Sequence, residues 1–141
     1  MRTKGLVVAT ALSIVAAIAA TAITQNAHAQ SSCEGERQSF KLIVRVVSNH
    51  PVEVMNSGLN ANNLHVCIGD EIEWQLVGAA KQFYVNFVAG VPFDGAGKTN
   101  SNNNGKITIV VGGPAKPGDS YKYDIGIVGG GVLDPRIIID R

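Results

Sequence analysis

Hydrophobic and polar residues alternate with a period of two along most of the chain after residue 38. The clearest case is segment 40–47, where Phe40, Leu42, Val44 and Val46 form one apolar face. Alternation of this kind predicts a β-strand with one buried face. Similar patterns predict further strands at residues 52–55, 64–68, 72–76, 83–88, 106–111, 120–128 and 132–139.

Turn-forming residues separate these segments. The separators are rich in Gly, Pro, Asn and Asp, and they include Asn49-His50-Pro51, Gly69-Asp70, Pro117-Gly118-Asp119 and Gly129-Gly130-Gly131. After residue 29 no stretch sustains the spacing of apolar residues that a helix requires. Seven or eight short strands joined by such turns predict an antiparallel Greek-key β-sandwich.

Two segments between the predicted strands are long and polar, 56–63 and 94–105. Asn and Gly dominate both segments, and because these residues tolerate positive φ, the composition predicts irregular loops. Loops on a rigid sandwich often hold ligands. Neither segment concentrates charge or aromatic rings, so a solvated connector is the simpler interpretation.

The first 29 residues have the order of a secretory signal peptide. A basic start that contains Arg2 and Lys4 precedes an apolar run, 6–23, and the segment ends in Ala27-His28-Ala29. We therefore expect cleavage between Ala29 and Gln30, and a periplasmic or secreted mature chain. An uncleaved anchor is the alternative, because eighteen apolar residues are just long enough to span a bilayer. No later run is long enough, so no membrane span is expected after cleavage.

Residues 30–141 are enough for one compact domain and too few for two ordinary ones. The whole chain of 141 residues has a formal net charge of +1, and loss of Arg2 and Lys4 would leave ten basic against eleven acidic residues. This balance argues against a nucleic-acid partner, because phosphate contacts require concentrated positive charge.

Cys33 and Cys67 are the two cysteines of the chain. In an oxidising compartment a lone pair in a small domain usually forms a disulfide, so we predict a Cys33–Cys67 bond. A redox or metal thiolate is the alternative interpretation. It has little support, because the pair is not a C-x-x-C and neither cysteine is followed closely by a histidine.

Three motifs resemble those of the cupredoxins, the plastocyanin-like sandwich proteins. Segment 66–74 (VCIGDEIEW) is similar to the family's V-x-x-G-D-x-V-x-W, segment 83–87 (FYVNF) to H-x-V-x-F, and segment 116–123 (KPGDSYKY) to x-P-G-x-Y-x-Y. The resemblance covers about residues 40–139, and the tail 132–140 resembles the final strand of small bacterial cupredoxin-like proteins. It implies a cupredoxin-like β-sandwich.

The copper ligands of that family are missing. A type 1 site needs a cysteine thiolate and two imidazoles, usually with an axial methionine. Phe83 stands where the resemblance would place the first histidine, Ile125 where it would place the cysteine, and residues 126–134 contain neither His nor Met. We therefore expect no type 1 copper site and no cofactor.

A different copper site is the alternative. His50, Met55 and His65 lie in an Asn-rich stretch, and His with Met is a sensible ligand set for copper. In the structural interpretation His50 begins a turn, Met55 fills a gap and His65 faces outward on a strand.

An enzymatic role has little support, because no G-x-S-x-G, H-E-x-x-H or P-loop pattern is present. Asp119, Asp124, Asp134 and Asp140 are the candidates for acid–base work, yet Asp is common at turns. We therefore expect a non-catalytic domain that binds a protein partner or a small ligand in the periplasm. Among the aromatic residues, Trp74, Phe83 and Phe87 are expected in the core, and a surface position is open for Tyr84, Tyr121 and Tyr123.

Overall fold

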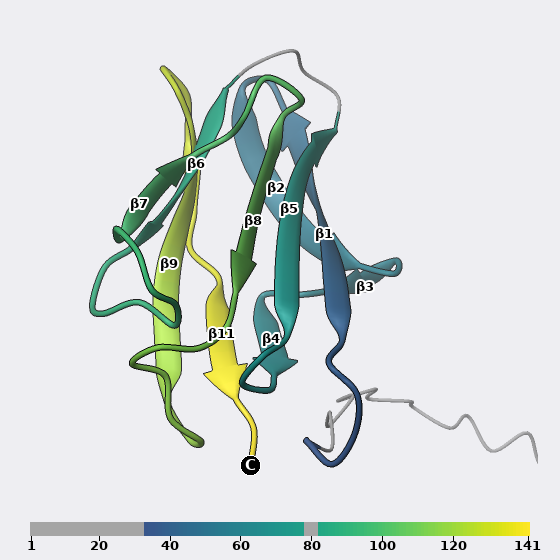
Figure 1. Ribbon diagram of the computed structural model, residues 1–141. Coiled ribbons are helices and arrows are strands. Elements are labelled where there is room, and N and C mark those ends of the chain that lie inside the picture. The colour runs from purple at the N-terminus through teal and green to yellow at the C-terminus, as the bar shows by residue number, and fades with distance from the viewer. Residues whose placement is uncertain (1–32, 78–81) are drawn as a thin grey trace, which may run out of the picture.

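The computed structural model describes residues 33–77 and 82–141, so the predicted signal peptide, 1–29, lies outside the described residues. The described ranges contain eleven strands and no helix. Two sheets face one another (Figure 1). The strands are β1 (Ser39–Val47), β2 (His50–Asn56), β3 (Leu59–Asn60), β4 (Asn63–Val66), β5 (Glu71–Val77), β6 (Phe83–Phe87), β7 (Lys98–Asn100), β8 (Lys106–Val110), β9 (Ser120–Ile127), β10 (Val132–Leu133) and β11 (Arg136–Ile139).

The predicted β-sandwich is confirmed, but the sheets are mixed. The first sheet has the order β3-β2-β1-β5-β8, and the second has the order β4-β11-β9-β6-β7, with β10 also paired to β9. β1 runs parallel to β5, and β4 runs parallel to β11, so the expectation of antiparallel pairing is wrong for these two pairs. The reason is that the chain crosses to the second sheet as β4 before it returns as β5, and side-chain alternation carries no information on the direction of a neighbour.

Two short strands lie inside the segments that were expected to be irregular loops. β3 pairs with β2, and β7 pairs with β6, so the loop prediction is wrong at these residues. Both strands are at a sheet edge, where a few residues need only one partner. The segment expected as a single strand, 132–139, is divided into β10 and β11 around Pro135, which has no N–H for a ladder.

The core lies between the two sheets and is centred on aromatic rings. The expected core positions of Trp74, Phe83 and Phe87 are confirmed. Tyr123 is fully buried, and its ring meets that of Trp74 edge to face at 5.6 Å between centroids. Tyr121 is also buried, so Tyr84 is the one of the three tyrosines that reaches the surface.

The predicted disulfide joins Cys33 to Cys67, with a Cα–Cα distance of 5.5 Å. The buried carboxylate of Asp70 holds the same region, because it accepts hydrogen bonds from the backbone N–H groups of Gln38 at 2.8 Å and Cys67 at 2.7 Å. The start of the described chain is thus fixed to the turn before β5. Across residues 33–77 and 82–141 we find no helix with the length and apolar character needed to cross a membrane.

Candidate binding groove

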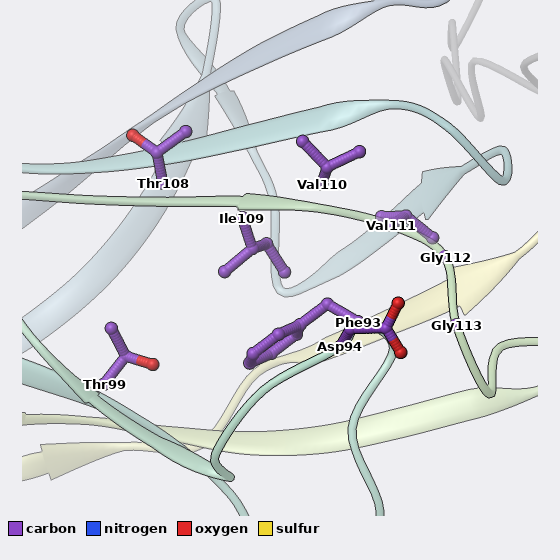
Figure 2. Close-up of a pocket in the computed structure, with 9 residues that line it drawn as sticks. All are labelled: Phe93, Asp94, Thr99, Thr108, Ile109, Val110, Val111, Gly112 and Gly113. Carbon is purple, nitrogen blue, oxygen red and sulfur yellow. The ribbon is translucent and has the colours of Figure 1, made fainter.

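An open groove of about 440 Å³ lies between β7 and β8. Each of these strands is the last of its sheet (Figure 1), so the groove lies at one side of the sandwich. Figure 2 shows Thr99 on one wall and Ile109 on the other, with the ring of Phe93 beneath. The groove is lined by Phe93, Asp94, Thr99, Thr108, Ile109, Val110, Val111, Gly112 and Gly113.

Phe93 forms the base of the groove and comes from the loop between β6 and β7. Its ring meets the ring of Phe87 edge to face at 5.5 Å, and only 8% of Phe93 is exposed. The loop is fixed on both sides of the ring. The N–H of Gly112 donates to the carbonyl of Pro92 at 2.8 Å, and Gly95 lies so close to Phe93 that a Cβ there would be 2.7 Å from the ring.

The outer edge of β8 has a short stretch of unpaired backbone. The N–H and C=O of Val111 both bond toward β5, to Asp70 and Gly69. Backbone groups of successive residues in a strand point to opposite sides, so those of Thr108 and Val110 point away from β5. Within the described ranges, no hydrogen bond joins these groups to another part of the chain.

Residues at both ends of this stretch are already bonded. At one end, Asn102 receives the N–H of Lys106 on its side-chain oxygen at 3.0 Å and donates its own N–H to the Lys106 carbonyl at 2.9 Å. At the other end, the N–H of Gly112 binds Pro92. The available edge is therefore limited to Thr108 and Val110.

Acidic side chains lie near this edge. On β5, Glu71 is opposite Val110 and Glu73 is opposite Thr108. Glu73 is paired with Lys106, whose Nζ is 3.0 and 3.1 Å from its two carboxylate oxygens. At the end of the groove, the Asp94 carboxylate covers Gly113, where a Cβ would lie 2.2 Å from Oδ1 (Figure 2).

The three residues of the alternative copper site do not converge. His50 and Met55 are five residues apart in β2, which separates their Cα atoms by about 16 Å. His65 is in β4 of the other sheet, and its Nδ1 is 2.8 Å from Asp140 Oδ1. In the described part of the chain, no three His, Cys, Asp or Glu residues are grouped so that they could hold a metal ion.

The two positions where the resemblance would place copper ligands are part of the core. Phe83 and Ile125 are both 0% exposed, on β6 and β9. Among the candidate acid–base residues, Asp119 accepts a hydrogen bond from the hydroxyl of Tyr121, and Asp134 pairs with Lys122. These carboxylates lie at turns and strand ends and do not line the groove.

The groove residues were missed by the sequence analysis. Phe93 interrupts a segment rich in Gly and Ala, and a large ring in such a segment is a weak signal of a local packing site. The pairing of Phe93 with Ile109 across the opening depends on which strands end each sheet. Alternation of side chains does not determine that order.

No family model matches the chain, and no curated protein matches it. The solved structures that match include the Cu(I) form of one amicyanin mutant, with 16% identity, coverage of 71% of this chain and 82% of that chain, and a TM-score of 0.44. A second reduced amicyanin mutant matches with the same identity and coverage and a TM-score of 0.43. Similarity at this level carries no conclusion about the family or a ligand of this chain.

Proposed function

We propose that this chain is an exported, non-catalytic binding domain whose groove between β7 and β8 is the binding site. The observation that carries the proposal is the groove itself, with the apolar side chains of Phe93 and Ile109 between two open sheet edges. Concave sites with an apolar lining and a few polar groups are the usual places for ligands.

Export is supported by the signal-like order of residues 1–29 and by the disulfide, since such bonds persist in oxidising compartments. Binding without catalysis is supported by the groove's chemistry. Asp94 is the single ionisable side chain among the lining residues, so the groove has no second acid or base to act with it, and no His or Lys lines the groove to activate the hydroxyl of Thr99 or Thr108.

Filling the groove tests the proposal. Nile red, a neutral dye that fluoresces in apolar surroundings, should bind the native protein saturably. Thr99→Trp places a ring in the opening and should reduce dye binding at least fivefold. Val128→Trp is the control, because Val128 is 60% exposed and does not line the groove. Equal binding by the Thr99→Trp variant, with an unchanged unfolding midpoint, would contradict the proposal.

A further inference from the structure

The open edge of β8 points to a particular class of ligand for the proposed groove. We infer that the ligand is an extended segment of a partner protein, which adds to β8 as an antiparallel strand at Thr108 and Val110 and places one apolar side chain in the groove. The inference rests on the proposed function, because it concerns the same site.

The first argument for strand addition comes from the backbone groups of β8. Thr108 and Val110 each present an N–H and a C=O on the side of β8 away from β5. In an antiparallel ladder one such residue exchanges two hydrogen bonds with the residue opposite it. Two residues therefore offer four hydrogen bonds, and an extended peptide is the ligand whose own backbone matches that spacing.

The second argument comes from the direction in which the side chains of β8 and of the added strand would point. Ile109 lies between the two bonding residues and points toward the core, with 7% of its surface exposed. The partner residue opposite Ile109 would point the same way, toward Phe93 and Thr99 in the groove (Figure 2). One apolar side chain at this position would be enclosed.

The third argument comes from the charged side chains of β5, which favour particular residues in the partner segment. Partner residues opposite Thr108 and Val110 would face solvent, on the side where Glu73 and Glu71 lie. Glu73 already forms an ion pair with Lys106. Glu71 instead accepts a hydrogen bond of 3.3 Å from Ser39 Oγ. A basic residue is therefore favoured opposite Val110, beside Glu71, and the partner residue after it is the apolar one that enters the groove.

The available edge also limits the length of the segment. Asn102 and Pro92 occupy the backbone groups just beyond the stretch, at Lys106 and Gly112. An added strand can therefore pair over about three to five residues. A short window of this kind also restricts the long edge-to-edge pairing that leads to aggregation.

The probe for the test is the blocked pentapeptide Thr-Lys-Leu-Lys-Thr, titrated into the full mature protein and followed by amide NMR. We expect shifts and slower hydrogen exchange at the Thr108 and Val110 amides. Methylation of both lysine amide nitrogens removes the donors that would face β8, and it should weaken binding at least tenfold. Methylation of the leucine nitrogen, which faces away from β8, should change binding less than threefold.

The matching protein variant is Val110→Pro, which removes an N–H that makes no internal bond. It should weaken peptide binding at least tenfold, whereas Val110→Thr should stay within twofold. Unchanged unfolding midpoints establish that both variants keep the fold.

The outcomes separate the inference from the proposed function. Dye binding in the groove without peptide binding, or equal binding of the doubly methylated peptide, would overturn strand addition and leave the groove as a ligand site. Absence of both dye and peptide binding would overturn both. A dimer in sedimentation that Val110→Pro dissociates would replace the partner with a second copy of this chain and would also overturn the inference.

Discussion

The two sheets meet at two places that are built differently. At the closed seam, formed by Asn49, Gly130 and Gly131, backbone lies directly on backbone. The N–H of Gly131 donates to the Asn49 carbonyl at 3.1 Å, and a Cβ on Gly130 would lie 2.1 Å from the same oxygen. At the open seam, formed by β7 and β8, the ring of Phe93 is the main group between the sheets.

This difference shows how one sandwich can combine a tightly closed side with an open side, where we propose that a ligand binds. Glycine removes the side chains that would hold two backbones apart, so the closed seam leaves no room for a ligand. An aromatic ring fills the base of the open seam but leaves the strand edges above it free. In the proposed function, the first seam stays intact while the second seam takes up a ligand.

The largest effect is expected from Gly130→Ala, which breaks the closed seam. The new methyl group would meet the Asn49 carbonyl at a distance that no real contact allows, so the two turns must separate. We expect the free energy of unfolding to fall by about 3 kcal/mol. Urea denaturation measures this change, and Gly112→Ala is the control, because nothing lies within 4 Å of a Cβ there. Equal stability of the two variants would show that the closed seam is not tightly packed.

A smaller loss is expected from Phe93→Ala, which removes the base of the open seam. A fully enclosed phenylalanine costs about 3–5 kcal/mol when it is cut to alanine. One side of Phe93 faces the groove, so we expect a loss of about 2 kcal/mol in the same urea experiment. Phe93→Leu should lose less than half as much. A loss larger than that of Gly130→Ala would reverse the comparison of the seams.

The sequence predicts the parts of the fold that depend on local pattern, and it does not predict the parts that depend on distant contacts. The long strands β1, β5 and β9 follow from alternation, because both their ends and their buried faces are set by local pattern. The disulfide follows from the cysteine count and the predicted export signal. The position of the edge strand β7 does not follow from the sequence, because the surrounding segment, 94–105, is rich in Asn and Gly and favours a loop until β6 provides a partner.

The groove could not be predicted for a related reason. It exists because β7 and β8 end their sheets side by side, and strand order depends on the path of the whole chain. The triplet Gly129-Gly130-Gly131 was recognised as a turn, but its need for glycine comes from Asn49 and His50, eighty residues earlier in the sequence. His50 and Met55 show the opposite case, in which closeness in sequence suggested a site that an extended strand separates.

The smallest expected change is in the pH dependence of the free energy of unfolding, and it concerns the aromatic rings that connect the open seam to the core. Phe93 contacts Phe87, and Phe87 packs at 5.2 Å on Tyr123. Burial raises the pKa of the Tyr123 hydroxyl well above its ordinary value of 10.0, and the hydrogen bond from Trp74 only partly opposes this shift. The folded protein therefore keeps the proton of Tyr123 at a pH where the unfolded chain has released it.

The sign of the pH dependence follows from that difference. Above pH 10 the unfolded state binds fewer protons than the native state, so stability should fall as pH rises, by about 1.4 kcal/mol per pH unit for one such group. Well below pH 10 Tyr123 should contribute no slope, because the unfolded chain also keeps the proton there. Urea denaturation between pH 9 and pH 11 measures the slope, and Tyr123→Phe should make it shallower. Part of the slope should remain in that variant, because burial and the nearby Asp119 carboxylate also raise the pKa of Tyr121. An identical slope in the variant would show that the ring contacts between the core and the open seam loosen before Tyr123 ionises.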